Sequence, residues 1–326
     1  MKRRFLALLL ALVMVFSLAA CTAGNNNKPA ESQAPADQAE EYHFVIILKD
    51  LTRPFMINMG NDAVAAGKLV NCKVDVQAPQ TPSSTEEQIK LIEDAIAAKV
   101  DGIIITPADS NAIIPGIEKA NAAGIPVSTP NTKAFGGDVL NWAGIQNYDV
   151  GCALGELLAE SLDYKGNVVL LEGIPGSSTS IDRINGYTDT LKKYPDITIL
   201  TTQTANFTRA EGMSVMENLL QKYDNINGIG SADKEMLLGA NEAIKAAGRS
   251  GIKGIGFDVE EDVLLAIKNG EVVATGDQHP ESQAFWGVIS LWAHLKGYAV
   301  PKECVIPMGV VNKDNVDEYL KRYEKK

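Results

Sequence analysis

Short apolar runs alternate with amphipathic stretches from about Tyr42 to the end of the chain. The runs predict strands at 43–48, 72–76, 102–106, 125–129, 140–145, 167–172, 197–202, 226–230, 253–257, 272–275 and 304–306. Helices are predicted between them, for example at 111–123 and 280–296, with a last one near 314–323. Continuous β-branched runs separated by helices are typical of parallel sheets built from βαβ units. The pattern therefore predicts two similar α/β halves with a crevice between their strand ends.

Polar residues follow several of these strands directly. Asp258 follows the strand at 253–257, Asp233 follows the strand near 226–230, and Asn131 follows the strand near 125–129. Open α/β sheets bind ligands beyond the carboxyl ends of their strands, so converging polar ends indicate a binding crevice. The alternative is that each Asp is the N-cap of the next helix.

The N-terminus has the pattern of an export signal. Lys2, Arg3 and Arg4 precede an apolar run at 5–15, which leads to Leu-Ala-Ala at 18–20 and then Cys21. A basic start, a short apolar stretch and small residues predict a signal peptide at 1–20. The run is short for a membrane span. The Leu-Ala-Ala-Cys sequence also resembles the bacterial lipobox, which implies a lipid on Cys21; simple secretion is the alternative.

Residues 22–41 contain no large apolar side chain, which predicts a flexible tether between Cys21 and the folded part. The remaining cysteines, Cys72, Cys152 and Cys304, are an odd number with no close spacing. They indicate neither a zinc site nor a redox dithiol, and we expect buried thiols.

Composition and missing motifs exclude several classes of function. The chain has 326 residues, which fits two domains better than one core. Its net charge of -11 argues against a nucleic-acid partner. The sequence has no P-loop, no dinucleotide fingerprint and no nucleophile elbow. His43, His279 and His294 are far apart in the sequence, so we expect no metal, no cofactor and no enzymatic activity.

A lipobox, a tether, two Rossmann-like halves and Gly256-Phe257-Asp258 together resemble the type I periplasmic sugar-binding proteins of ABC transporters, the ribose-binding branch in particular. The resemblance covers about 42–312. Further matching segments are 53–55 (Arg-Pro-Phe), 106–110, 123–127, 183–187, 235–240 and 274–278. The lactose-repressor type of regulator shares this fold, but it needs a DNA-binding headpiece where this chain has a signal peptide.

The resemblance implies an α/β fold of two lobes with parallel sheets joined by a three-strand hinge. The first lobe would comprise 42–145 and 279–308, and the second 146–278 and 309–326. The crossings between them are expected near 145–146, 278–279 and 308–309.

The resemblance also implies the ligand residues. Phe55 and Phe207 match aromatic side chains that stack on a sugar ring, and Arg183, Asp258 and Gln278 match polar ligand contacts. Four further positions depart from the ribose-binding pattern: Arg53, Asn131, Thr132 and Asp233. The predicted site is therefore Arg53, Phe55, Asn131, Thr132, Arg183, Phe207, Asp233, Asp258 and Gln278.

The charges of this set favour a neutral ligand. Arg53, Arg183, Asp233 and Asp258 sum to zero formal charge, which suits a neutral polyhydroxylated ligand better than a sugar acid or a cation. The departures from the pattern argue against ribose itself. Trp142 could add a further ring, although core packing is the expected role.

We therefore expect an extracytoplasmic solute-binding lipoprotein of an ABC importer. It would bind a neutral monosaccharide or polyol by hinge closure, act as a monomer, and have a membrane permease and the lipid anchor as its partners. Two alternatives stay open: a sensor for a sugar-like signal such as a furanosyl autoinducer, and a sugar-acting enzyme that uses Asp233 and Asp258 as a carboxylate pair.

Overall fold

The computed structural model describes residues 42–323. The predicted signal peptide, Cys21 and the tether lie outside these residues. The first lobe consists of β1 (His43–Ile47), α2 (Pro54–Leu69), β2 (Lys73–Gln77), α3 (Thr85–Ala97), β3 (Gly102–Ile105), α4 (Ile114–Ala122), β4 (Val127–Pro130), β5 (Val139–Gly144), α10 (Pro280–Leu295) and β11 (Glu303–Val305). Its six-stranded sheet has the order β11-β5-β4-β3-β1-β2, with every neighbouring pair parallel.

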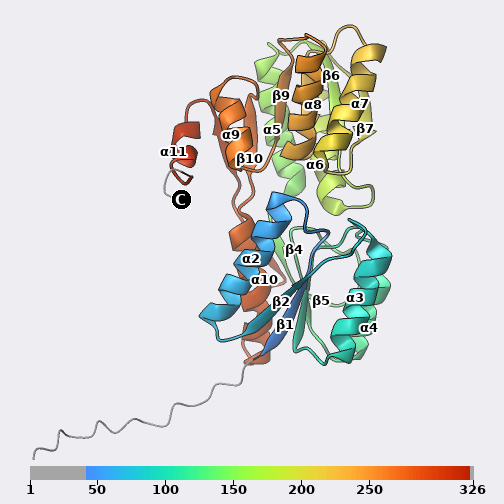
Figure 1. Ribbon diagram of the computed structural model, residues 1–326, viewed down its shortest axis with the longest axis vertical. Coiled ribbons are helices and arrows are strands. Elements are labelled where there is room, and N and C mark those ends of the chain that lie inside the picture. The colour runs from blue at the N-terminus through green and yellow to red at the C-terminus, as the bar shows by residue number, and fades with distance from the viewer. Residues whose placement is uncertain (1–41, 324–326) are drawn as a thin grey trace, which may run out of the picture. The chain divides into compact units, whose positions relative to one another are not determined.

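The alternation of side chains along β1 explains how helices cover both faces of this sheet. Phe44 and Ile46 are buried in one cluster with apolar residues of α2 and α10. Val45 and Ile47 point to the other face, into a cluster with residues of α3 and α4. Figure 1 shows α2 and α10 on one side of the sheet and α3 and α4 on the other. A strand buried on both faces has the continuous apolar run seen in the sequence.

The second lobe consists of α5 (Asn147–Ser161), β6 (Gly166–Glu172), α6 (Ser178–Leu191), β7 (Ile197–Thr204), α7 (Arg209–Lys222), β8 (Gly228–Ser231), α8 (Lys234–Ala246), β9 (Lys253–Phe257), α9 (Glu261–Lys268), β10 (Ala274–Asp277), β12 (Gly309–Asn312) and α11 (Val316–Leu320). Its sheet has the order β12-β10-β9-β8-β6-β7. The pairs are parallel except that β12 is antiparallel to β10. The sequence pattern did not predict β12, because four residues at a sheet edge give too short an apolar signal.

Two glycines let α5 and α6 pack closely, and this contact positions Arg183. A Cβ at Gly151 would lie 2.4 Å from the carbonyl oxygen of Arg183, and one at Gly186 would lie 2.3 Å from that of Tyr148. Backbone therefore meets backbone here, which only glycine permits. The close packing fixes the helix from which Arg183 extends.

Three connections join the two sheets, as predicted: from β5 to α5, from β10 to α10, and from β11 to β12. The predicted two-lobe α/β fold is confirmed. The exact residue boundaries proposed for the lobes remain a prediction.

The structure differs from the sequence prediction in two local features. The helix predicted from Asn111 begins only at Ile114, because Asp109 Oδ1 accepts hydrogen bonds from the backbone of Asn111 and Ala112 and holds a turn there. Cys72 is buried as expected, whereas Cys152 and Cys304 are only half-buried.

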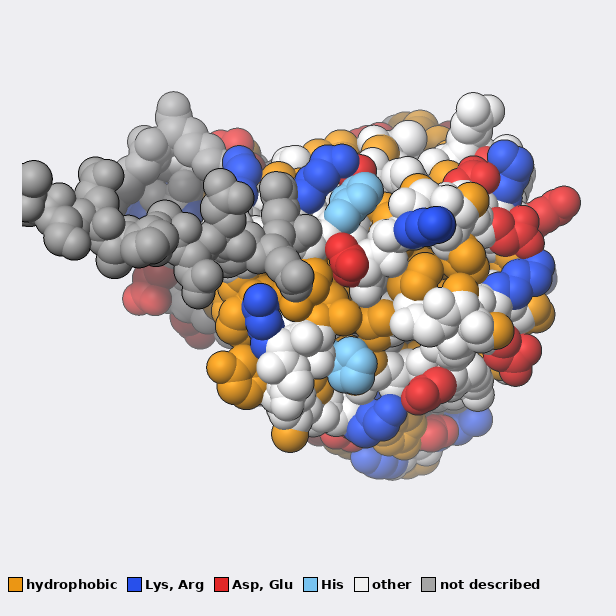
Figure 2. Space-filling model, turned by 90° about the horizontal axis from the view of Figure 1, so that it is seen from below, with side chains coloured by type: hydrophobic (Ala, Val, Ile, Leu, Met, Phe, Trp, Pro, Cys, Tyr) orange, Lys and Arg blue, Asp and Glu red, His pale blue; other side chains and the backbone are white. Residues whose placement is uncertain are grey.

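Within residues 42–323, none of the helices has the length and apolar character needed to cross a bilayer. Figure 2 shows one face of the molecule, on which lysine or arginine side chains and acidic side chains are interspersed with apolar ones.

Candidate functional site

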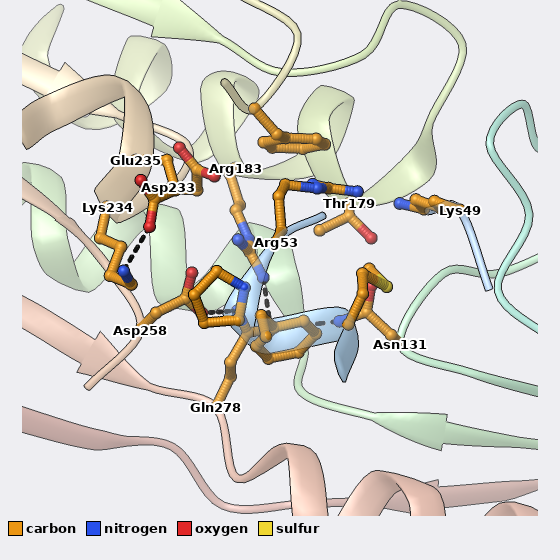
Figure 3. Close-up of a pocket in the computed structure, with 14 residues that line it drawn as sticks. Lys49, Arg53, Asn131, Thr179, Arg183, Asp233, Lys234, Glu235, Asp258 and Gln278 are labelled. Carbon is orange, nitrogen blue, oxygen red and sulfur yellow. Dashed lines mark hydrogen bonds and ion pairs between the residues drawn. The ribbon is translucent and has the colours of Figure 1, made fainter. Parts of the chain in front are cut away.

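A cavity lies between the strand ends of the two lobes. Its lining residues are Lys49, Arg53, Pro54, Phe55, Met56, Asn131, Thr179, Arg183, Phe207, Asp233, Lys234, Glu235, Asp258 and Gln278. Eight of the nine predicted site residues are in this set, and Figure 3 shows their side chains converging from both lobes. Thr132 is the exception. It is fully buried and its hydroxyl shares a 2.9 Å hydrogen bond with that of Thr179.

Arg183 makes three side-chain hydrogen bonds at the cavity. Its Nε donates to Asn147 Oδ1 at 2.8 Å, Nη1 to the carbonyl of Ala232 at 2.7 Å, and Nη2 to Gln278 Oε1 at 2.7 Å. Its guanidinium lies 3.8 Å from the ring centroid of Phe257. Burial lowers its pKa to about 10, against the opposing effect of Asp258. Three of its five N–H groups are thus used, and two remain for a ligand.

Gln278 links the two lobes at the hinge. Its Oε1 accepts hydrogen bonds from Arg183 of the second lobe and from Asn131 Nδ2 of the first, the latter at 3.1 Å. Its Nε2 donates to Asp258 Oδ1 (Figure 3). Since Oε1 accepts from two N–H groups, the orientation of the amide is determined.

Asp233 and Asp258 follow neighbouring strands but have different local roles. Asp233 is the N-cap of α8, and its Oδ1 accepts a 3.0 Å hydrogen bond from the backbone of Met236. The N-cap reading of strand-end aspartates is therefore right for Asp233. It is wrong for Asp258, because Glu260 is the N-cap of α9. Asp258 has a left-handed backbone, with φ of 75°, and its carboxylate is held by Gln278.

Both carboxyl groups have raised pKa values because they are buried. Desolvation, followed by repulsion from Asp258, raises the pKa of Asp233 to about 7. Desolvation also raises the pKa of Asp258, and attraction to Arg183 opposes that shift. A hydrogen bond donated by a ligand hydroxyl would stabilise the ionised form of such a buried carboxylate.

The two aromatic residues of the cavity come from different lobes. Phe55 belongs to the first turn of α2, and Phe207 precedes α7. Arg53 lies 5.4 Å from the Phe207 centroid and is held within its own lobe by Asp50, whose Oδ2 accepts from its Nε at 2.7 Å. Desolvation of Asp50 is outweighed by Arg53, so the pKa of Asp50 is lowered.

Sequence reasoning missed Lys49, which follows β1. It is 1% exposed, and its Nζ donates to Ser177 Oγ of the other lobe at 3.1 Å and lies 5.5 Å from the Phe207 centroid. Desolvation, reinforced by Arg53 and Arg183, lowers its pKa well below the usual range. The rule that found Asp233 and Asp258 at strand ends also applies to Lys49, so the signal was present.

Lys234 and Glu235 were also missed. Lys234 is almost fully buried and forms ion pairs with Glu235 and with Asp262, the latter at 3.1 Å. Lys234 and Glu235 both line the cavity. Pro54, Met56 and Thr179 complete the lining residues that were not predicted.

The lobes are in direct contact beside the cavity, so the cleft is closed. Ser110 N donates to the carbonyl of Gly176, and Ser178 N donates to Ser110 Oγ, both at 3.0 Å. Lys133 N donates to Ser178 Oγ, also at 3.0 Å. Gly176 has φ of 83°, and a Cβ there would lie 2.1 Å from Asp109 Oδ2. The glycine-rich segment at 173–176, which could have suggested a phosphate loop, therefore lies at the interface between the lobes.

Trp142 packs behind the cavity, in line with its expected core role. It is 4% exposed, and its Nε1 donates to the carbonyl of Asn131 at 3.4 Å. Among the residues that the structure describes, no group of three or more metal-ligating side chains is placed to hold a metal ion.

The family model described as periplasmic binding protein domain matches residues 44–299. The chain belongs to this family. A ribose import binding protein of Bacillus subtilis is 34% identical to this periplasmic binding protein over 82% of the chain and 85% of the relative.

Two solved structures show the same fold. A periplasmic solute-binding protein of an ABC transporter from Actinobacillus succinogenes, with bound D-allose, has a TM-score of 0.80 and 31% identity, covering 86% of this chain and 100% of that one. A solute-binding protein from Bacillus halodurans, with bound myo-inositol, has a TM-score of 0.82 and 25% identity, covering 88% and 100%. These relatives are binding proteins of transporters, which agrees with the prediction that this periplasmic binding protein is not an enzyme.

Proposed function

We propose that this protein is the extracytoplasmic solute-binding component of an ABC importer and takes a neutral monosaccharide or polyol into the cavity between its lobes. The observation on which this rests is the convergence of Arg183, Asp233, Asp258 and two aromatic rings on one cavity. Aromatic faces suit the apolar C–H surface of a sugar, and charged groups form the stronger hydrogen bonds to its hydroxyls.

The full set of lining charges supports a neutral ligand. The lining has four cationic side chains, Lys49, Arg53, Arg183 and Lys234, and three carboxylates, Asp233, Glu235 and Asp258. Asp50 and Asp262, the ion-pair partners of Arg53 and Lys234, lie just outside the lining, so positive and negative charges differ by no more than one. A charged ligand would disturb this balance inside a desolvated site.

Hinge closure is the proposed mechanism. Arg183, Asp233 and Asp258 are on the second lobe, whereas Arg53, Phe55 and Asn131 are on the first, so a ligand that touches both sets stabilises the closed form. The membrane permease of the importer would then recognise the closed protein. Neither nucleic acid nor a second copy of the chain has a part in this proposal.

Anchoring by a lipid on Cys21, after removal of residues 1–20, is also proposed. It is supported by the Leu-Ala-Ala-Cys sequence and by the tether composition. Expression in a bacterial host should give a mature chain that begins at Cys21 and enters the detergent phase, while Cys21→Ser should abolish lipid labelling. An unlabelled native chain in the soluble fraction would favour simple secretion.

A ligand screen tests the central proposal. Thermal shift with pentoses, hexoses, alditols and cyclitols, including D-ribose, D-allose and myo-inositol, should identify compounds that raise the unfolding temperature. Isothermal titration should then give one site per chain, and small-angle scattering should show a more compact protein on binding. If no compound of these classes bound, the proposal would be wrong.

Two further measurements separate transport from the alternatives. Deletion of the gene should abolish uptake of the radiolabelled ligand, whereas a sensor would leave uptake unchanged and alter a signalling response. Incubation of the purified protein with the ligand should return it unmodified, whereas a sugar-acting enzyme would convert it.

A further inference from the structure

The outer face of α10 is apolar although it faces solvent. Five apolar residues recur along this helix at the spacing of one helical face. We call them the outer stripe: Phe285, Trp286, Ile289, Trp292 and Ala293. Trp286 is 40% exposed and the other four are half-buried. A surface helix normally has polar residues on its outer face, so this face lacks its usual covering of polar side chains.

A groove between α2 and α10 widens the outer stripe. Leu69 of α2 lines the groove together with Phe285 and Trp286. It is 74% exposed, more than any other large apolar side chain that the structure describes. Asp62 and Glu281 also line the groove, nearer the start of α10, so its hinge end is acidic. A contiguous exposed apolar surface of this kind marks a contact site.

The outer stripe leads to the point at which the described chain begins. Tyr298 is 63% exposed, and its ring centroid lies 6.1 Å from that of Trp292. Lys296 Nζ lies 4.9 Å from the ring centroid of Tyr42, the first described residue. Figure 2 views this end of the first lobe, where apolar side chains gather next to lysine or arginine and histidine side chains. The segment that leads to Cys21 therefore joins the lobe beside the apolar surface.

This end of the lobe is basic. The segments 63–74 and 282–302 contain four lysines and no acidic residue. Two of these lysines form ion pairs with carboxylates, which within the described residues leaves Lys68 and Lys296, both exposed. An anionic surface would therefore be accepted at this end and repelled at the acidic hinge end of the groove.

The length of the preceding segment keeps a lipid surface within reach. Residues 22–41 separate Cys21, the proposed lipid-bearing residue, from Tyr42. Twenty residues span at most about 70 Å, and roughly 25 Å on average as a flexible chain. The net charge of -11 opposes adsorption of the free chain on anionic lipid. Anchoring changes this, because a short tether gives the lobe a high effective concentration at the membrane.

We propose that the outer stripe, Leu69, Tyr298 and the two lysines form a membrane-docking surface, which rests on the anionic lipid bilayer that holds the Cys21 anchor. Trp and Tyr rings favour the boundary between head groups and acyl chains, and lysines favour anionic head groups. All of these residues belong to the first lobe, so docking leaves the second lobe free to move. The inference rests on the proposed lipid anchor and does not depend on which solute is bound.

Quenching by brominated lipid tests the docking. The lipidated chain is placed in vesicles of phosphatidylethanolamine and phosphatidylglycerol, with or without bromine on the acyl chains. Of its three tryptophans, Trp286 and Trp292 belong to the outer stripe and Trp142 is buried. Bromine should remove about half of the emission, because an interfacial helix face lies about 5–10 Å into the head-group boundary. Trp286→Phe combined with Trp292→Phe should leave an emission that bromine does not quench.

A pair of substitutions assigns the quenching to this surface. Leu69→Glu with Lys296→Glu places carboxylates at two exposed positions and should reduce the quenching about threefold or more, because anionic head groups repel them. Leu265→Glu with Lys222→Glu is the matched control, at exposed positions of the second lobe. It makes the same charge change, and Lys222 also lies over a tyrosine ring, at 5.1 Å. The control should quench as the native chain does, and thermal unfolding should show that both variants are folded.

The outcomes separate this inference from the other proposals. Equal emission from brominated and plain vesicles would overturn it and leave the anchor and solute binding standing, and so would full quenching in the Leu69→Glu, Lys296→Glu variant. If the stripe instead holds a second copy, the chain should be a dimer in detergent that this variant dissociates, without quenching. A native chain with no lipid on Cys21 would overturn the docking together with the anchor, whereas a failure of sugar binding would affect neither.

Discussion

The two lobes contribute unequally prepared surfaces to the shared cavity. In the second lobe, the Arg183 guanidinium is fixed by Asn147 and a backbone carbonyl, and Asp233 is fixed by the start of α8. In the first lobe, Lys49 Nζ donates its hydrogen bond across the cleft to Ser177. The second lobe thus holds a preformed half-site, whereas in the first lobe Asp50 fixes Arg53 but Lys49 finds its partner only on closure.

This difference indicates how much each lobe contributes to the affinity for the ligand. Groups that are fixed before binding cost little entropy to place, so they should determine most of the affinity for the ligand. Groups that find partners only across the cleft should mainly affect the equilibrium between open and closed forms. Four predictions test this division.

The largest effect is expected on the preformed half-site. Arg183→Ala or Asp258→Ala should weaken binding of the ligand found in the screen by roughly ten- to a hundredfold, since each removes hydrogen bonds to a charged group of about 1.5–3 kcal/mol. Titration calorimetry measures it. Arg249→Ala, at a partly exposed position far along the chain, is the control. Unchanged affinity in both variants would remove these residues from the site.

A smaller loss, of about tenfold, is expected for Lys49→Met, which keeps the apolar stem and removes one charged donor. If the first lobe acts mainly through closure, small-angle scattering should show a larger fraction of open protein at equal ligand occupancy. Lys68→Met, at the exposed end of α2, is the control. A hundredfold loss would show that the first lobe is as important as the second.

The third prediction concerns the folding stability that is lost because the preformed half-site buries the carboxylate of Asp233. Asp233 has a raised pKa in the folded protein, about 7, so the folded state holds its proton more tightly than the unfolded chain. Its contribution to stability therefore falls as the pH rises from about 4 to about 7 and is constant above that. Asn caps helices equally well.

Asp233→Asn should accordingly gain stability relative to the native protein between pH 4.5 and pH 7.5, with no further gain at pH 9. Urea denaturation of both proteins at these pH values measures the difference. The exposed Asp149→Asn should show no such trend. A difference that is independent of pH would mean that Asp233 titrates normally.

The smallest effect is expected for Thr132→Val. It removes the hydrogen bond to Thr179 across the cleft and the 3.0 Å hydrogen bond to Asn131 Oδ1, but Thr132 does not line the cavity. We expect a change in affinity of less than threefold, by titration, because both hydrogen bonds are neutral, at about 0.5–1.5 kcal/mol each to stability, and neither is made to the ligand. A tenfold loss would place Thr132 in the site.

Most of the fold was predictable because buried parallel strands have a strong local signal. The strand at 253–257 was predicted with the bounds that the structure has, and the helix predicted at 280–296 corresponds to α10 (Pro280–Leu295). β12 was not, because an edge strand of four residues acquires its identity from its pairing with β10. The turn held by Asp109 was missed for a similar reason, since a side chain there replaced the first helical turn.

The predicted site residues came from two sources: polar residues at strand ends, and positions that match ligand-binding positions of the family. Asp258, Arg183 and Gln278 could be named in advance, yet nothing local showed that one amide would bond to residues of both lobes. Lys49 follows a strand as Asp233 does, but its burial against Phe207 depends on the other lobe.

By itself, the sequence determined the order of strands and helices, the two-lobe class, and the polar residues that end the strands, because these depend on side-chain periodicity and chain direction. Only the tertiary structure decided that Asp258 is held by Gln278, that the hydroxyl of Thr132 bonds to Thr179 across the cleft, and that Lys49 is buried against Ser177 and Phe207. These features depend on contacts between residues that are distant in the chain, such as Lys49 and Ser177, which are 128 positions apart, and no local pattern specifies them.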